Sequence, residues 1–295
     1  MKDETLYRWN KRVDSDELQR WEDELVFSGI SHAVEKSVGR KTWQLLAYFP
    51  GRREAEDLKA RFGGGVTRVR PEDWQPQSEA SDTVIRIRDR FVVTEHLDPE
   101  KIEALAAEHP DRTVLSFPAQ MAFGTGGHPT TASCLRMLVD TVAAGESENS
   151  RPWSMLDLGC GSGILAVAAE KLGAGPVAAV ELDGKALDVA RENAVRNAAP
   201  GIEFIEADAA KWLADARRAK RRFDLVAANL FSELLIALFP KIAAVTAPGG
   251  TVIVSGFLTS QTRDVSEAAR RAGVPLARFI RRGKWVAGLG GKNAG

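Results

Sequence analysis

The sequence predicts an α/β fold, in which a doubly wound parallel sheet follows a small α+β module, and two observations point to it. First, apolar runs of strand length alternate with helical stretches through the C-terminal half of the 295-residue chain. Second, the first of these runs ends in alternate glycines, since residues 156–163 read Leu-Asp-Leu-Gly-Cys-Gly-Ser-Gly. A helical apolar repeat begins at Ile164, so the glycines fall at a strand-to-helix turn.

This glycine turn suits a bound ligand. Glycine permits positive φ and close approach, and the free N–H groups at a helix start attract electron-rich groups. A dinucleotide fingerprint would use Gly161, Gly163 and Ala166, and a turn without a ligand is another alternative. We favour a third interpretation, because Asp157 lies two residues before Gly159 and completes Asp-x-Gly-x-Gly-x-Gly. That pattern resembles the first motif of class I methyltransferases, which implies a Rossmann-like sheet whose Asp157, Gly159, Gly161 and Gly163 bind S-adenosyl-L-methionine (SAM).

A second carboxylate strengthens this interpretation. The apolar run Val177–Leu182 contains Glu181 at the spacing of a ribose-binding acid in a βαβ unit. A carboxylate can accept hydrogen bonds from both hydroxyls of a ribose, and the alternative is a solvated charge at a strand end. Asp208, after the next strand, is expected either near the adenine or in solvent.

The remaining C-terminal segments continue the alternation. Further strands are expected at Ile202–Ile205, Phe223–Ala228 and Thr251–Ser255, and helices at Lys185–Asn197, Ser232–Val245 and Ser260–Ala272. In the 232–245 helix, one apolar stripe carries Leu234, Leu235, Leu238 and Ile242. Two last strands, 276–281 and 285–289, would add an antiparallel edge. Because ligands bind at the carboxyl ends of parallel strands, Glu181, Asp208 and Asn229 are expected at one edge of the sheet.

The first 72 residues predict a separate module. Its expected elements follow the order βαββαβ, at Leu6–Val13, Asp16–Phe27, His32–Val38, Thr42–Phe49, Arg52–Phe62 and Val66–Arg70. This order suggests a ferredoxin-like α+β domain. Its tryptophans, Trp9, Trp21 and Trp43, are expected in its core, with a protein-binding surface as the alternative. Residues 73–111 are interpreted as a linker and β-ribbon, because 71–81 are polar and proline-bearing and 84–94 alternate apolar with charged residues.

Composition argues against several functions. Forty basic residues balance 40 acidic ones, so no net charge attracts nucleic acid or anionic membranes. No run approaches the roughly 18 apolar residues of a membrane span. Cys160 lies inside the glycine turn and only Cys134 accompanies it, which argues against a disulfide framework. The four histidines lack metal-ligand spacing, so we expect no metal, and a cytoplasmic location.

A second motif narrows the family. Residues 121–131 read Met-Ala-Phe-Gly-Thr-Gly-Gly-His-Pro-Thr-Thr. Together with the glycine turn, Ala190–Ala194 and Ala228–Leu230, they resemble the PrmA family of bacterial ribosomal-protein methyltransferases, over roughly residues 112–290. The resemblance implies a SAM-dependent domain at 112–295, a substrate-recognition domain at 1–72, and methylation of lysine and N-terminal amines of large-subunit ribosomal protein eleven. The positions that it implies for contact with SAM are Thr131, Gly159, Glu181 and Asn229.

Methyl transfer needs orientation more than acid–base chemistry, because the methyl group is already activated. Asn229 follows the fourth strand and offers an amide oxygen that could steer the acceptor nitrogen, so we assign it as the catalytic residue. A turn-capping role is its alternative. His128, just before Pro129, is expected to pack or to cap a helix rather than to act as a base.

Departures from the family pattern fall on the acceptor side. Relatives carry Asp-Pro-Gly where this chain has Pro118-Ala119-Gln120, and Asn-Ile-Leu-Ala where it has Asn229-Leu230-Phe231-Ser232. Gly127 replaces a threonine. Phe231 is expected either to line the amine pocket or to pack, since phenylalanines recur at intervals of eight over 223–239. A methyltransferase for another protein, a small molecule or nucleic acid, and a SAM-binding protein without activity, are the alternative functions; a monomer is expected.

Overall fold

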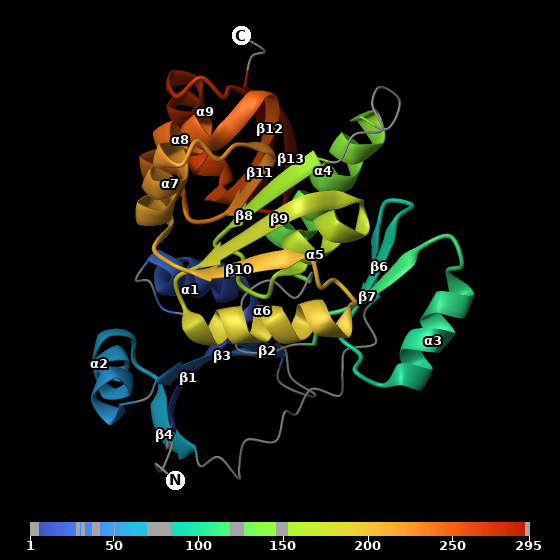
Figure 1. Ribbon diagram of the computed structural model, residues 1–295. Coiled ribbons are helices and arrows are strands. Elements are labelled where there is room, and N and C mark those ends of the chain that lie inside the picture. The colour runs from blue at the N-terminus through green and yellow to red at the C-terminus, as the bar shows by residue number, and fades with distance from the viewer. Residues whose placement is uncertain are drawn as a thin grey trace. The chain divides into compact units, whose positions relative to one another are not determined.

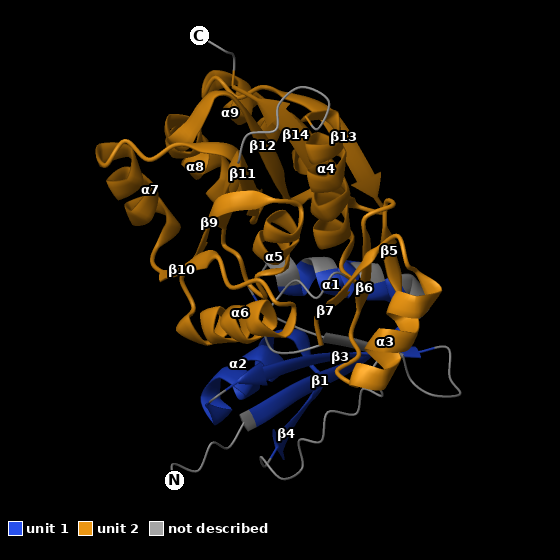
Figure 2. Cartoon of the chain, turned by 45° about the vertical axis from the view of Figure 1, so that its right-hand side comes forward, with its two compact units in different colours: residues 1–79 blue, residues 80–295 orange. Residues whose placement is uncertain are grey.

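The computed structural model describes residues 6–27, 30, 33–36, 42–49, 51–69, 84–118, 127–145 and 153–292. The chain divides into two compact units, residues 1–79 and 80–295 (Figure 2). The sequence suggested three parts, 1–72, 73–111 and 112–295, whereas the contacts place the ribbon at 84–94 in the second unit. The linker expected at 71–81 lies outside the described residues.

The first unit is a four-stranded antiparallel sheet with two helices. Its elements are β1 (Leu6–Asp14), α1 (Ser15–Phe27), β2 (Ala33–Lys36), β3 (Thr42–Phe49), α2 (Arg52–Phe62) and β4 (Gly65–Val69). The strands are ordered β2-β3-β1-β4. Element order and bounds therefore follow the sequence prediction closely.

Tryptophan side chains contribute to the apolar core of the first unit. Trp9 is fully buried among Leu45 of β3 and Leu58 of α2, and its Nε1 donates to the carbonyl oxygen of Gly63 at 2.7 Å. Trp21 and Trp43 pack against the same cluster. The expectation of a core role is confirmed for Trp9, whereas Trp21 and Trp43 are only partly buried at the edge of this core.

The second unit carries a seven-stranded sheet. Its first elements are β5 (Ile85–Ile87), β6 (Phe91–Thr94), α3 (Pro99–Glu108), β7 (Thr113–Ser116) and α4 (Pro129–Gly145). Then follow β8 (Trp153–Leu158), α5 (Ile164–Lys171), β9 (Ala174–Glu181), α6 (Gly184–Arg196), β10 (Ile202–Glu206), α7 (Ala209–Arg218) and β11 (Phe223–Asn229). The last are α8 (Ser232–Val245), β12 (Thr246–Leu258), a 3₁₀ turn (Thr259–Gln261), α9 (Thr262–Arg271), β13 (Leu276–Arg282) and β14 (Trp285–Gly291).

Strand order explains where a ligand can bind. The large sheet runs β10-β9-β8-β11-β12-β14-β13, parallel from β10 to β12 and antiparallel at β14 and β13. The order reverses direction between β8 and β11, and ligands of doubly wound sheets bind at such a switch point, outside the carboxyl ends of the strands. The predicted doubly wound sheet with an antiparallel edge is confirmed.

Helices cover both faces of this sheet (Figure 1), and an apolar layer lies on each face. In the middle of β8, β9, β11 and β12, odd-numbered residues pack with α4, α5 and α6, among them Met155, Ala179, Ala227 and Ile253. Even-numbered residues there pack with α7, α8 and α9, among them Leu156, Val180, Val226 and Val254. This alternation is what a strand covered on both faces requires.

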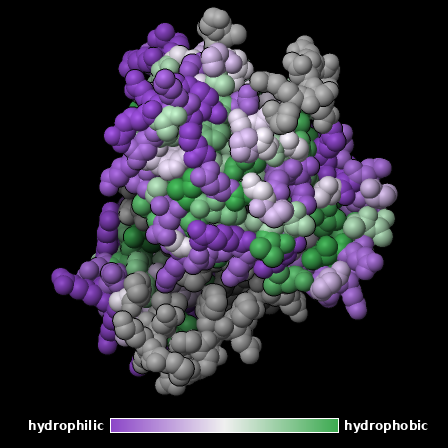
Figure 3. Space-filling view, in the orientation of Figure 1, coloured by the Kyte–Doolittle hydropathy of each residue, from purple (hydrophilic) through white to green (hydrophobic). Residues whose placement is uncertain are grey.

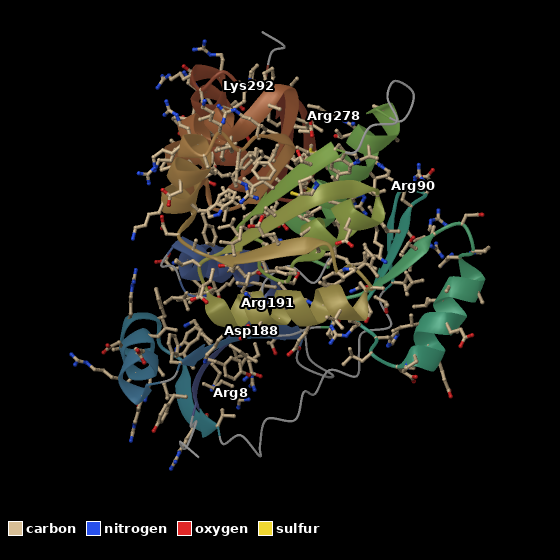
Figure 4. The ribbon with its side chains drawn as sticks, in the orientation of Figure 1. Arg8, Arg90, Asp188, Arg191, Arg278 and Lys292 are labelled. Carbon is tan, nitrogen blue, oxygen red and sulfur yellow. The ribbon has the colours of Figure 1, made fainter. Side chains whose placement is uncertain are left out.

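The helices that cover the large sheet have charged residues on their outer faces. Over α7 and α9 the surface is largely hydrophilic (Figure 3). On α6, Arg191 pairs with Asp188, whereas Lys292, after β14, donates to the carbonyl oxygens of Ala243 and Thr246 at the end of α8 (Figure 4). That last pair of bonds satisfies carbonyls that a helix end leaves without partners.

A small second sheet, β5-β6-β7, was only partly foreseen. The ribbon β5–β6 agrees with the prediction, but α3, β7 and most of α4 were not predicted. Asn197, just after α6, connects this helix to β7 of the small sheet. Its Oδ1 accepts from the Ser116 amide at 2.8 Å, and its Nδ2 donates to the Ser116 carbonyl at 2.9 Å.

Candidate functional site

The glycine turn has the backbone that its sequence predicts. Gly159, Gly161 and Gly163 all have positive φ, at 71°, 51° and 78°. The amides of Gly159 and Cys160 donate to the carbonyl oxygen of Val180, at 2.8 and 3.1 Å, and so join the turn to the end of β9. An L side chain adopts such φ values only at a cost of roughly 1–2 kcal/mol per residue.

Close packing also requires glycine here. A Cβ at Gly159 would overlap Cδ2 of Leu230, which follows β11, and a Cβ at Gly163 would lie 3.0 Å from the Cβ of Ala190 on α6. The glycine turn is therefore packed closely against Leu230 on one side and against Ala190 of α6 on the other.

Asp157 lies beneath the turn and supports it. Its carboxyl is only 1% exposed, and Oδ2 accepts from the Ala166 amide in the first turn of α5 at 3.1 Å. Because Gly163 at the N-cap has no side chain, Asp157 supplies the acceptor that a capping residue would otherwise provide. Burial, with a smaller contribution from the charge of Glu181, raises the pKa of Asp157 to about 7, although the Ala166 hydrogen bond opposes the shift.

Glu181 lies beside the turn, as its spacing predicts. Its Oε2 accepts from the Gly161 amide at 3.0 Å, and its Oε1 accepts from the amides of Leu182 and Asp183 at 2.7 and 3.1 Å. Unlike Asp157, Glu181 is only partly buried. Backbone donors thus fix a partly exposed carboxylate next to the glycines.

Asn229 lies at the carboxyl end of β11, across from the start of α4. Its Nδ2 is 3.2 Å from Oγ1 of Thr130 and 3.4 Å from Oγ1 of Thr131, and both threonines are buried. Its Oδ1 is buried and has no hydrogen-bond partner among the residues that the structure describes. Buried polar atoms are almost always paired, so this acceptor is a candidate for a donor from a ligand.

His128 packs and caps, in agreement with the sequence interpretation. Its Nδ1 lies 2.7 Å from Oγ1 of Thr130, and its ring meets Trp285 edge to face, with centroids 5.2 Å apart. Burial, and then the positive charge of Lys284, lowers the pKa of His128 to about 4. Sequence reasoning assigned Trp285 only to a strand, because nothing local connects it with a histidine more than 150 residues away.

Asp208 caps α7. Its carboxylate accepts from the Lys211 amide at 2.9 Å. Its side chain is partly exposed at the carboxyl end of β10, so the capping contact leaves part of the carboxylate accessible. Its predicted position near an adenine stays a prediction.

Phe231 corrects one expectation. Phe223 and Phe239 are buried at 2% and 0% exposure, but Phe231 is 60% exposed. The interval of eight therefore does not make all three phenylalanines core residues, because Phe231 lies in the loop before α8 rather than on the buried side of a helix or strand.

These residues fit SAM. The turn keeps side chains away from its glycines, a carboxylate lies at one side, and a buried amide oxygen lacks a donor at the other. SAM would bring ribose hydroxyl and ammonium donors.

Within the described ranges, no helix is long and apolar enough to cross a membrane, and no three metal-binding side chains converge. Both cysteines are free and buried. Residues 121–126 of the second motif lie outside the described part of the chain.

Comparisons with known proteins agree with this site. The profile of the family described as ribosomal protein L11 methyltransferase (PrmA) matches residues 14–293. A ribosomal protein L11 methyltransferase from Allorhizobium ampelinum is 36% identical over 259 residues, which cover 84% of each protein. One from Brucella abortus is 36% identical over 241 residues, or 79% of this chain and 80% of the relative.

A solved structure supports the fold. The crystal structure of ribosomal protein L11 methylase from Lactobacillus delbrueckii subsp. bulgaricus superposes with a TM-score of 0.55 at 26% identity, covering 71% of this chain and 98% of that one. The resemblance read from the two glycine-containing motifs is confirmed, and this chain belongs to the ribosomal protein L11 methyltransferase (PrmA) family.

Proposed function

We propose that this chain transfers methyl groups from SAM to amines of ribosomal protein L11. Its family membership and its relatives support this enzyme class, cofactor and substrate. The observation that carries the proposal is the buried Oδ1 of Asn229 beside the glycine turn, which has no hydrogen-bond partner within the described part of the chain. It is an acceptor placed for an N–H donor.

The cofactor would be held by residues from four strand ends. Glu181 would bind the ribose, the backbone at Gly159, Gly161 and Gly163 would approach the ligand closely, and Asp157 would keep that backbone in shape from below. Thr131, Asp208 and Asn229, the last at the end of β11, are the remaining proposed contacts. SAM supplies a methyl group that its sulfonium already activates.

Asn229 would orient the acceptor. A lysine amine must first lose a proton, which its ordinary pKa of about 10.4 resists in water and burial favours. An N–H of the neutral amine can then donate to Oδ1 of Asn229, which directs the nitrogen lone pair. Thr130 and Thr131 hold the amide group in place through Nδ2.

His128 is not proposed as the base. Its low pKa makes it a weak proton acceptor at neutral pH, and its Nδ1 is already engaged with Thr130. We therefore propose that water removes the proton and that the site accelerates transfer by orientation.

Further parts of the proposal rest on the sequence. Residues 1–72 would recognise the substrate protein, and the enzyme would act as a cytoplasmic monomer without binding nucleic acid. Balanced charge and two free cysteines support the location and the absence of a polyanion partner.

The test is methyl transfer from labelled SAM to purified ribosomal proteins. We expect label in L11, and turnover about 100-fold lower with Asn229→Ala, because misplacing the acceptor costs about that much. The melting temperature should stay close to wild type. Label in another protein alone would contradict the substrate, and unchanged turnover would remove Asn229 from the mechanism.

A further inference from the structure

The loop before α8 exposes an aromatic ring that the fold does not need. Phe231 is 60% exposed, whereas its neighbour Leu230 is partly buried and packs in the apolar layer of α7 to α9. Leu230 precedes the helix cap, and Leu235, fully buried, lies in the second helical turn. Such a pair fixes the entry of a chain into a helix. The start of α8 is thus already anchored without the ring.

Phe231 also occupies a position that favours other residue types. It is the N-cap of α8, at φ −61° and ψ 151°, and its carbonyl oxygen accepts from the Leu235 amide at 3.0 Å. Its own side chain makes no capping hydrogen bond. The helices α3, α6 and α7 use aspartates at the same position, namely Asp98, Asp183 and Asp208. Phenylalanine gives up a capping bond there, so stability does not account for it.

Along the chain, the ring follows directly after the proposed methyl-transfer site. Asn229 is two residues earlier, and in extended chain side chains two apart face the same way. Leu230, between them, faces the opposite layer and contacts the glycine turn. Leu234, three residues after Phe231 on the exposed side of the first helical turn, is 42% exposed. Residues at this spacing are neighbours on a helix surface.

We propose that Phe231 and Leu234, the α8 rim, form the surface on which the acceptor polypeptide lies while its amine reaches Asn229. This inference rests on the proposed function and names the partner chemistry at this site: a peptide segment with an apolar side chain next to the target amine. The surface is continuous with the site, because Asn229 and Phe231 are separated only by the residue that packs on the glycine turn. A large exposed aromatic next to a binding site is the kind of residue that anchors protein contacts.

The experiment compares Phe231→Ser with Phe231→Leu and a matched control. Serine removes the ring and supplies the missing cap, so the melting temperature should stay the same or rise. The KM for L11 should increase about tenfold, as loss of an interface anchor of this kind predicts, while the Kd for SAM stays unchanged. Leucine keeps an apolar contact and should restore most of the affinity for L11. Phe279→Ser, on the edge strand β13 where the ring is 42% exposed, should change neither constant.

Each other outcome contradicts the inference. An unchanged KM in Phe231→Ser removes the ring from substrate binding. Equal losses of SAM and L11 affinity place it in the cofactor site, and a lower melting temperature makes it structural. If the wild-type enzyme does not label L11, both the proposed function and the role of the α8 rim are wrong. If the wild type labels L11 but the KM of Phe231→Ser is unchanged, only the role of the α8 rim is wrong.

Discussion

Asp157 and Glu181 are two carboxylates on neighbouring strands with different environments. Asp157 points from the central strand β8 into the layer of α4 to α6, where it is almost fully buried, and it accepts a single backbone amide. Glu181, at the end of β9, is partly exposed and accepts three. Burial without enough donors disfavours the charged form. Asp157 is thus suited to holding the turn, and Glu181 to meeting a ligand.

The raised pKa of Asp157 predicts a pH dependence. A carboxyl whose pKa rises to about 7 on folding stabilises the fold fully below its ordinary pKa of 3.8, and this contribution is lost as pH rises through 7. Asp157→Asn cannot ionise, yet keeps an acceptor for the Ala166 amide. We therefore expect the free energy of unfolding of the wild type, relative to this variant, to fall between pH 5 and pH 8.

Denaturant titration without SAM measures that difference. Comparing the two proteins at each pH cancels the titration of all other groups. A wild-type-minus-variant difference that is the same at both pH values would contradict a protonated Asp157 in the folded state.

Spacing in the sequence pointed to these two candidate site residues, but not to their burial. Asp157 was found because it lies two residues before Gly159, and Glu181 because it follows the next apolar run. Which of them is covered depends on the helices that pack over each strand end. For the same reason, the contact of Asn229 with Thr130, 99 positions away, has no local signal in the sequence.

At the scale of elements, α8 shows both the strength and the limit of periodicity. Its span, 232–245, agrees with the prediction, and Leu235, Leu238 and Ile242 are buried as expected. Leu234, placed on the same stripe, is instead 42% exposed. At 100° per residue, both Leu234 and Leu235 fit a broad stripe, and only the packing of the helix on the sheet separates them.

The difference in burial between Leu234 and Leu235 predicts that the same substitution to alanine will lower the free energy of unfolding by unequal amounts. Leu235→Ala should lower the free energy of unfolding by about 2–5 kcal/mol, because it leaves a cavity in the layer between α8 and the sheet. Leu234→Ala should cost less than about 1 kcal/mol, since the side chain is already half in water. Thermal or denaturant unfolding checks both variants. Similar losses would mean that Leu234 is as well packed as Leu235.

The sequence prediction missed α3 and most of α4. The helix α3 has no buried residues and carries only Ile102 and Leu105 at helical spacing, which is a weak periodic signal, although Asp98 caps it and Pro99 opens it as start signals predict. The strand β12 begins at Thr246 rather than at the predicted Thr251, because its pairing with β11 starts before the Pro248-Gly249-Gly250 segment. That register jump, from Phe223 opposite Thr246 to Leu225 opposite Thr251, depends on the neighbouring strand.

At the scale of the whole catalytic unit, one carboxylate joins three elements that are distant in sequence. Asp140 of α4 accepts from Nε and Nη2 of Arg88, at 2.7 and 2.8 Å, and from Nη2 of Arg278 on the edge strand β13, at 2.5 Å. Arg88 follows β5 of the small sheet. The pattern of apolar residues predicted the layers of this unit, but a bridge between β5, α4 and β13 depends on side-chain geometry that the pattern does not contain.

Removing this carboxylate should loosen the bridge. Burial disfavours the charge of Asp140, but the hydrogen bonds from Arg88 and Arg278 outweigh burial and hold its pKa below the ordinary 3.8. Asp140→Asn should lower the free energy of unfolding by about 1–2 kcal/mol at pH 7, a value reduced because both arginines remain partly exposed. The matched control is Asp188→Asn, which breaks the exposed pair with Arg191 on α6 and should cost at most about 0.5 kcal/mol.

The sign of the pH effect is opposite to that of Asp157. A carboxyl whose pKa falls on folding contributes stability that is complete above its ordinary pKa and is lost as pH falls through the lower folded value. The gap between wild type and Asp140→Asn should therefore be constant from pH 5 to 8 and narrow only below about pH 4. Equal stability of wild type, Asp140→Asn and Asp188→Asn at pH 7 would show that the bridge forms without stabilising the unit. In that case the apolar layers alone would hold β5, α4 and β13 together.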